Sequence, residues 1–195
     1  MNKVAIIGVG HTKFGKLNDK NLLDLLSEAS LKAIEDSNTS NKDFDSVYVG
    51  VMSPEILNHM SGVANALVDR ISLLPAGADH LKNGPASGGS AIKAGFQAIA
   101  SGMSDLVLVV GGEKMTHIST PGFITSTVAT ITHNEAERIH GVSLPSYGGL
   151  LTRAYLDKYN AKLEWISDIS IKNHKNGALN PYAHFQRPIE DFMKS

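Results

Sequence analysis

The chain contains no cysteine. This absence excludes disulfide bonds, thiolate metal sites and cysteine nucleophiles from the sequence as it stands. An excess of either charge is also lacking, because 18 Lys and Arg face 19 Asp and Glu, for a formal net charge of −1. Such a balance provides no electrostatic reason to expect nucleic acid or an anionic membrane as a partner. The eight histidines include no pair with the spacing of a metal site, so we expect no bound metal.

Long hydrophobic runs are missing too. The longest apolar runs, such as residues 106–110, are far too short to cross a bilayer. The apolar N-terminal stretch is followed at once by the polar HTKFGK, which indicates a buried first strand and not a signal peptide. With 195 residues, 42% of them hydrophobic, the chain is large enough for one sizeable core. We therefore expect a globular protein of the cytoplasm.

The apolar pattern alternates between strands and helices. Continuous or β-branched runs predict buried strands at residues 4–10, 46–52 and 105–111. Helical periodicity predicts helices at residues 21–36, 61–71, 86–101, 147–159 and 163–175. Residues 113–145 show no sustained period and predict a surface excursion, and Pro181 and Pro188 predict an extended or turning segment after the last helix. The order predicts an α/β layer fold with a mostly parallel sheet.

The stretch NGPASGGSAI, residues 83–92, predicts a turn that leads into a helix. A helix N-terminus carries positive potential and outward N–H groups, a setting that activates a nucleophile or holds an oxyanion. Pro85 has neither a nucleophile nor a backbone N–H, although proline suits the first helical position. Ser87 and Ser90 carry hydroxyls, but no neighbouring base in the sequence argues for their activation. On local evidence, a structural role explains this stretch better than a catalytic one.

Two other stretches carry polar or glycine clusters. Gly8, Gly10 and Gly15 follow the first apolar run, but their spacing differs from the dinucleotide-binding fingerprint, so a strand-to-loop turn is the better interpretation. Residues 173–185, NHKNGALNPYAHF, gather amide and imidazole groups around a Pro-Tyr turn. These groups are equally compatible with a pocket lining and with the capping of a helix end.

Four segments together resemble the N-terminal half of a thiolase. They are VAIIGVGHTKFG, the stretch from NGPASGGSAI to GGEKMT, the region of residues 147–159, and NHKNGALNPYAHFQRPI. The resemblance is closest to archaeal acetyl-CoA acetyltransferases and thiolases of the sterol-carrier-protein-x type. It implies a thiolase-like layered fold, a mostly parallel mixed sheet flanked by helices, with a helical loop domain. We expect an N-terminal α/β domain at residues 1–115, and the loop domain with the start of the return at residues 116–195.

The resemblance places Pro85 where the family has the cysteine that accepts the acyl group. The backbone N–H of that cysteine also belongs to the family's oxyanion hole, so proline removes nucleophile and donor together. Covalent acyl transfer by the family's route is therefore not expected, and Ser87 is the nearest remaining hydroxyl. Thiolases are about twice as long, and their second half supplies a catalytic histidine and a second cysteine. In the family, the last strand of the first domain comes next. Without that strand, we expect an open sheet edge beside residues 105–111 or nearby.

The resemblance also implies ligands and partners. A coenzyme A thioester is the expected ligand, with no tightly bound cofactor, and the expected substrate-binding residues are Asn173, Asn176, Asn180 and Tyr182. We expect a homodimer through the N-terminal domain and a partner subunit that supplies a C-terminal thiolase half. An OB-fold partner, as found with archaeal thiolases, is a further candidate.

Three hypotheses of different classes follow. The chain is one subunit of a split thiolase-fold enzyme, of which a cysteine-less aldolase-type lyase is one form. Alternatively, it is a non-catalytic acyl-CoA-binding or scaffold subunit. The third hypothesis is a degraded copy that is stabilised by self-association.

Overall fold

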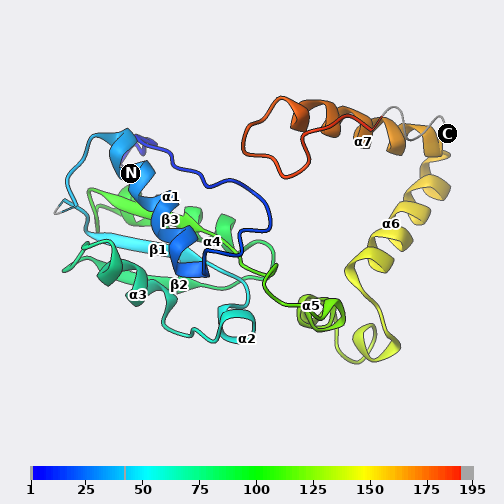
Figure 1. Cartoon of the computed structure of the whole chain (residues 1–195), viewed down its shortest axis with the longest axis horizontal. Helices are drawn as coiled ribbons and strands as arrows, with labels where there is room; N and C mark the ends of the chain where they lie inside the picture. Colours follow the sequence, from blue (N-terminus) through cyan, green and yellow to red (C-terminus); the bar gives the residue numbers. More distant parts are fainter. Residues whose placement is uncertain (1, 42, 190–195) are drawn as a thin grey trace. The chain divides into compact units, whose positions relative to one another are not determined.

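In the computed structural model, which describes residues 2–41 and 43–189, the chain separates into two compact units (Figure 1). The first contains the chain up to Thr12 and Lys16–Ser119, and the second contains Lys13–Gly15 and the chain from Thr120 onward. The domain boundary expected between residues 115 and 116 stays a prediction. Within the described residues, no helix is both long and apolar enough to span a membrane.

The first unit is a three-stranded parallel sheet with helices on both faces. Its strands are β1 (Ser46–Gly50), β2 (Gly77–Leu81) and β3 (Val107–Gly111), in the order β2-β1-β3. Its helices are α1 (Leu22–Ser37), α2 (Pro54–Asn58), α3 (Val63–Arg70) and α4 (Ser87–Ser101). Ser46 pairs with Gly77 on one side and Val107 on the other, and the register continues to Gly50. This arrangement confirms the predicted α/β layer fold and its parallel sheet.

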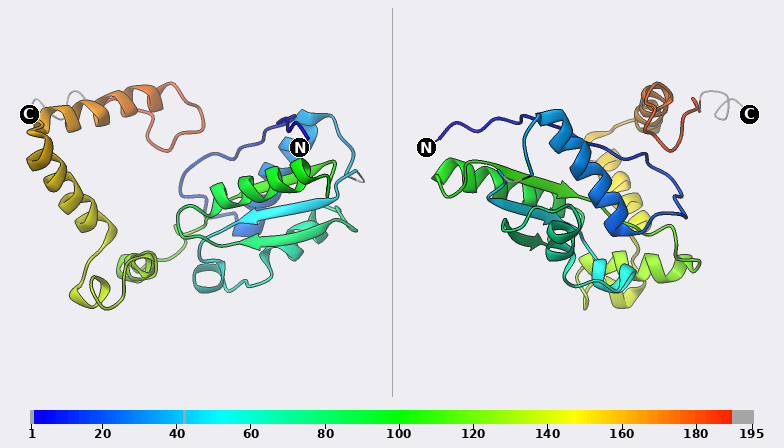
Figure 2. Two further views of the ribbon diagram at one scale, coloured as in Figure 1. Left: turned by 180° about the vertical axis from the view of Figure 1, so that it is seen from behind. Right: turned by 60° about the vertical axis from the view of Figure 1, so that its left-hand side comes forward.

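Strand alternation divides the sheet into two apolar faces, which different helices cover (Figures 1 and 2). One face buries valines and leucines of β1 and β3 against α1 and α3, in a core that contains Leu22, Leu26, Val47, Val49, Val63, Leu67, Val68, Leu108 and Val110. The opposite face carries Tyr48, Val107 and Val109 beneath α4. A Cβ added at Gly95 would lie 2.6 Å from Val109 Cγ2. The small residues of α4 therefore let this helix lie close to the sheet.

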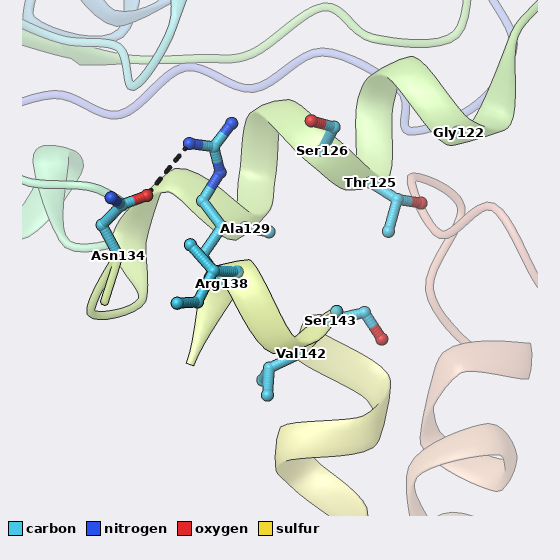
Figure 3. Close-up of a pocket in the computed structure, with 10 residues that line it drawn as sticks. Gly122, Thr125, Ser126, Ala129, Asn134, Arg138, Val142 and Ser143 are labelled. Atoms are coloured by element: carbon cyan, nitrogen blue, oxygen red, sulfur yellow. Dashed lines mark hydrogen bonds between the residues drawn. The ribbon is translucent and has the colours of Figure 1, made fainter. Parts of the chain in front are cut away.

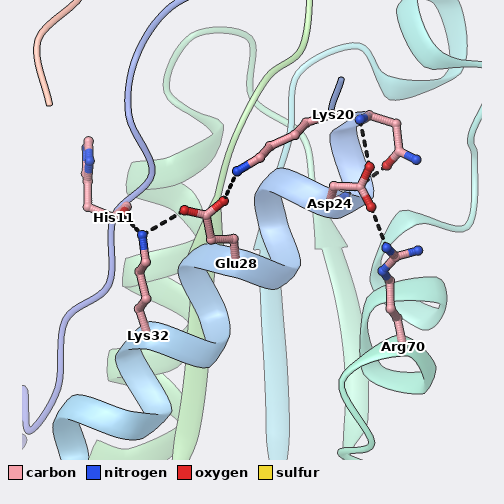
Figure 4. Close-up of polar contacts among 7 residues, drawn as sticks. His11, Lys20, Asp24, Glu28, Lys32 and Arg70 are labelled. Carbon is pink, nitrogen blue, oxygen red and sulfur yellow. Dashed lines mark hydrogen bonds and ion pairs between the residues drawn. The ribbon is translucent and has the colours of Figure 1, made fainter. Parts of the chain in front are cut away.

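Helix α1 is held at its polar side by ion pairs (Figure 4). Glu28 accepts hydrogen bonds from Lys20 and from Lys32, the second at 2.7 Å. These two bonds hold the pKa of Glu28 below its ordinary value, and the bond from Lys20 has the larger effect. Asp24 pairs with Arg70 at the end of α3. The apolar face of α1 packs on the sheet while these contacts fasten its outer face to neighbouring segments.

The prediction of a first strand at residues 4–10 is wrong. This segment has no strand partner in the described part of the chain, and Ile6 is 86% exposed and Val9 69% exposed. It lies instead along α1, where the Val9 N–H donates to Asp36 Oδ2 at 2.8 Å. A Cβ on Gly10 would come within 2.0 Å of Ala29 O, so the glycines serve close approach to a helix and not a turn. An apolar run predicts strand propensity, but it does not show whether a partner strand is available.

Strand β2, the sequence GADHL, was not predicted. Its residues are partly or largely exposed, and it lacks the continuous apolar run that marked the other strands. Backbone pairing with β1 carries it into the sheet. The opposite edge is formed by β3, and among the described residues nothing pairs with its outer side, as expected for an open edge beside residues 105–111.

The second unit is helical. It contains α5 (Pro121–Val128), the 3-10 turns η1 (Ala129–Ile131) and η2 (Arg138–His140), α6 (Leu144–Tyr159) and α7 (Leu163–Ala178). Two of these helices match the predicted ones, with α6 starting three residues earlier and α7 ending three residues later. After α7, the described chain turns without regular structure, as its prolines predicted. No residue of α6 or α7 is buried.

Candidate functional site at the tip of helix α4

The turn before α4 is built by backbone hydrogen bonds and one glycine. Gly84 has a φ of 52°, which a side chain would disfavour, and the Ser87 N–H donates to Gly84 O at 3.1 Å. Ala86 is the N-cap residue, so Pro85 lies one position before the cap and two positions before the first helical residue. The helix therefore begins one residue later than the predicted start at residue 86, and Pro85 lies outside it. Pro85 is an exposed turn residue, held by the geometry of Gly84 and Ala86.

The hydroxyl of Ser87 is a structural group of this turn. It donates to Gly84 O at 2.7 Å and accepts from the Asn83 N–H at 2.9 Å, and the residue is only 3% exposed. Asn83 in turn donates through Nδ2 to Ser90 Oγ at 3.0 Å. Both serines therefore fasten the turn to the helix. Their hydrogen bonds explain the small and polar residues of NGPASGGSAI without any catalytic role.

The helix tip sits at the carboxyl end of the parallel sheet. A Cβ added at Gly50, the last residue of β1, would lie 2.5 Å from Ser87 O, so the first turn of α4 abuts the end of that strand. Gly111, the last residue of β3, lies beside the same turn, because its added Cβ would be 3.7 Å from Gly88 Cα. Open α/β sheets bind ligands at this edge. The fold thus places the Pro85 turn where chemistry is ordinarily located.

Glu113 is the unusual charged group at this edge, and the site predictions did not include it. Its Oε2 accepts from the Met52 N–H at 2.8 Å, whereas its buried Oε1 has no hydrogen-bond partner. Burial raises the pKa of Glu113 above its ordinary value, against the opposing effect of the Met52 and Ser53 N–H groups. In the sequence, Glu113 is a single acidic residue directly after an apolar strand and two glycines. Hydrophobic patterning takes no account of such a residue.

The neighbouring polar groups of this edge are paired. His80, in β2, donates from Nε2 to Val51 O at 2.9 Å, and Lys82 forms a 2.7 Å ion pair with Glu55. His80 acts electrostatically to lower the pKa of Glu113, and Glu55 acts to raise it. In the described ranges, no three His, Asp or Glu side chains come together as a metal site would require. The edge therefore offers one under-bonded carboxylate and no metal cage.

The four expected substrate-binding residues all lie at the end of the second unit. Asn173 and Asn176 belong to α7 and are exposed, while Asn180 and Tyr182 lie in the segment after it. Asn180 Oδ1 accepts from the Tyr182 N–H at 2.9 Å, and its backbone carbonyl accepts from Gln186 Nε2 at 3.1 Å. Asn180 therefore shapes the turn after the helix. Their binding role stays a prediction.

This segment folds back along α7. The rings of His184 and Phe185 stack with centroids 4.7 Å apart, and His174 Nδ1 donates to Arg187 O at 3.3 Å. A Cβ on Gly177 would meet Phe185 O at 3.3 Å, which accounts for glycine on the helix face that receives the segment. The amide and imidazole groups of residues 173–185 are thus contributed by α7 and by the irregular segment that folds back along it.

Comparisons with known proteins agree with this architecture. The chain is 37% identical over its whole length to an acetyl-CoA acetyltransferase of Methanothermobacter thermautotrophicus, of which it covers 51%. It is 35% identical over 95% of its length to an acetyl-CoA acetyltransferase of Methanocaldococcus jannaschii, of which it covers 46%. The structure of an Ltp2-ChsH2(DUF35) aldolase matches 98% of this chain and 48% of its own, with a TM-score of 0.69 and 23% identity. The chain spans about half the length of these relatives.

The family model "Thiolase, N-terminal domain" matches residues 4–192, nearly the whole sequence. The parallel sheet flanked by helices agrees with a thiolase-like α/β fold. The chain therefore belongs to the thiolase family and corresponds to its N-terminal half, with proline at the turn before α4.

Proposed function

We propose that this chain is a thiolase-fold component that handles coenzyme A thioesters and does not itself form an acyl-enzyme at the tip of α4. Pro85 carries the proposal. At the position that the resemblance assigns to the acyl-accepting cysteine, the chain has neither a nucleophilic atom nor a backbone N–H. The similarity to acetyl-CoA acetyltransferases supports a thioester as the ligand.

No nearby hydroxyl replaces the missing thiol. An attacking serine needs a base within hydrogen-bond reach and an accessible oxygen. Ser87 is buried, and its hydroxyl is engaged with Gly84 and Asn83. A substitute nucleophile at this turn is therefore not part of the proposal.

The second candidate function is aldolase-type cleavage of a coenzyme A thioester. The same proline favours it, because carbon–carbon bond cleavage by a base needs no acyl-cysteine. The structural match to the Ltp2-ChsH2(DUF35) aldolase supports a fold compatible with that reaction. A third candidate is a binding or scaffold role in which thioester binding persists without turnover.

In all three cases the groups that complete the site come from outside the described residues. A C-terminal thiolase half would supply them, on the same polypeptide or on a partner chain. We include in the proposal a homodimer formed through the first unit and, as a further partner, an OB-fold subunit. Asn173, Asn176, Asn180 and Tyr182 are proposed to contact the thioester from the second unit.

The first experiment separates binding from acylation. Acetyl-CoA is titrated calorimetrically into the protein, and the mixture is then analysed by intact-mass spectrometry. We expect saturable binding without an acetyl adduct. A stoichiometric adduct on Ser87 or at residue 85 would show the proposal to be wrong. If acetyl-CoA does not bind at all, the part of the proposal that names a coenzyme A thioester as the ligand is contradicted.

The second experiment separates the three functions. The chain is co-expressed with a C-terminal thiolase half, and the complex is assayed for thioester condensation and for release of a ketone or aldehyde from a 3-hydroxyacyl thioester. Release without acyl transfer favours the aldolase candidate. A stable complex that binds the thioester without turnover favours the binding role. A soluble monomer that forms no complex with the second half contradicts the split-enzyme hypothesis.

A further inference from the structure

The second unit contains a cavity that the proposed function does not use. It has a volume of about 490 Å³ and is formed by α5, η1, η2 and the start of α6 (Figure 3). Apolar groups of Ala129, Ile139 and Val142 line it together with the side chains of Ser126, Asn134 and Arg138. This volume lies within the range of small-molecule sites. Five of the ten lining residues are polar, but most of the lining surface is apolar, and this combination fits an organic ligand better than a bare ion.

Arg138 is the cationic group of this cavity, and no carboxylate among the described residues pairs with it. Its guanidinium makes one hydrogen bond, from Nη1 to Asn134 Oδ1 at 3.3 Å, which Figure 3 shows as a dashed line. The adjacent Glu137 is engaged elsewhere, because its Oε2 accepts from the His133 N–H at 2.7 Å. A guanidinium presents five donors, so most of its donors remain available for an anion.

Backbone donors at this end of the cavity are already used. The Ser143 N–H donates to Ser146 Oγ at 2.9 Å, and Ser143 and Ser146 together form the capping box of α6. The Gly141 N–H donates to Arg138 O at 3.0 Å. A phosphate dianion would require more donors and more positive charge than one guanidinium supplies. A carboxylate matches it, because its two oxygens pair with the planar fork of a single arginine.

We propose that this cavity binds an organic monocarboxylate with an aliphatic body. Its carboxylate pairs with Arg138, and its hydrocarbon lies on Ala129, Ile139 and Val142. The Ser126 hydroxyl, on α5, is a second polar group for the ligand. None of these residues belongs to the turn before α4 or to the residues proposed to contact the thioester.

The test uses hexanoate as the probe and calorimetry or NMR chemical shifts as the readout on the full chain. Saturable binding of hexanoate, with hexanamide binding much more weakly, is the expected result. Arg138→Gln should weaken hexanoate binding by about tenfold or more, as expected for loss of a charge-assisted pair. Arg153→Gln is the matched control, since it removes the same charge from an exposed ion pair with Asp157 on α6 and should leave binding within about twofold.

A second variant, Ser126→Leu, keeps the arginine and obstructs the cavity, and should also weaken binding. Arg138 and Ser126 are both exposed, so neither change threatens folding. The proposal is overturned if hexanoate does not saturate, if hexanamide binds equally well, if inorganic phosphate binds more tightly, or if Arg138→Gln and Arg153→Gln behave alike. None of these outcomes affects the acylation test at the tip of α4.

Discussion

The proposed function assigns two chemical losses, of a nucleophile and of a backbone N–H, to one exposed turn residue, Pro85. The turn itself does not depend on the proline, because Gly84, Ser87 and Asn83 hold it through their own hydrogen bonds. Chemistry and architecture are therefore separable at this position. The residue can be changed while the helix start remains.

For Pro85→Cys we expect an intact fold and only slow acetylation by acetyl-CoA. The substitution restores a thiol, but under the proposed function the groups that complete the catalytic site come from a C-terminal thiolase half, and misplaced reactants commonly lose about 100-fold in rate. Intact-mass spectrometry over time, beside a cysteine-containing archaeal relative, measures this difference. Ala86→Cys, one residue closer to the helix, serves as the control. Rapid stoichiometric labelling of Pro85→Cys would contradict the prediction.

The contribution of Glu113 to the stability of the protein falls as the pH rises. Burial raises its pKa in the folded state, so the folded protein binds this proton more tightly than the unfolded chain does. The proton therefore favours folding at low pH, and this contribution is lost as the pH rises through the raised pKa. Most carboxylates in ion pairs, Glu28 among them, have the opposite effect.

We predict that Glu113→Gln becomes more stable relative to the parent as the pH increases from about 4.5 to 7, the range above an ordinary glutamate pKa. The amide retains an acceptor for the Met52 N–H and carries no charge to bury. Urea unfolding at a series of pH values measures the difference. A constant offset between the two proteins would show that Glu113 does not titrate in this range.

At the scale of secondary structure elements, the apolar segment of residues 4–10 and the polar strand β2 exchange the roles that their sequences suggest. Each outcome follows from a neighbour. The first segment lies on the backbone of α1, and β2 pairs with β1. Helices were predicted more accurately than strands. Their backbone hydrogen bonds lie within one segment, and the same segment contains the periodic apolar residues that indicate a helix.

Gly10→Ala should detach the N-terminal segment from α1. The added methyl group would meet Ala29 O at 2.0 Å, and overpacking of this kind costs roughly 1–3 kcal/mol. In the parent protein the Val9 N–H donates a hydrogen bond to Asp36, and in the variant its hydrogen exchange should become faster. Gly15→Ala provides the comparison, since nothing lies within 4 Å of its added Cβ. Equal exchange in both variants would refute the contact.

At the scale of the whole molecule, apolar surface remains exposed. Ile6, Ile7 and Val9 are 86%, 54% and 69% exposed, and β3 is the outer strand of the described sheet. Contiguous apolar surface and free strand edges favour association. A protein with this surface is expected to acquire a covering partner.

We predict that the purified chain self-associates with rising concentration and that Ile6→Lys with Val9→Lys lowers its average mass. Size-exclusion chromatography with light scattering gives the readout. Leu179→Lys, at an 82% exposed position of the second unit, should change the mass less. A monomeric parent at every concentration tested would count against association through this segment.

The sequence by itself determined the layer class, five of the seven α-helices of the described residues and the family, because periodicity, composition and motif order are local properties of the chain. The helix after Pro85 was predicted to begin at residue 86, one residue before its observed first residue, Ser87. Tertiary structure alone decided that residues 4–10 lie on α1, that β2 joins the sheet, that Ser87 is buried in a turn, and that Glu113 has an unpartnered oxygen. Each of these depends on which distant backbone or side chain comes near, and hydrophobic patterning contains no information about that choice.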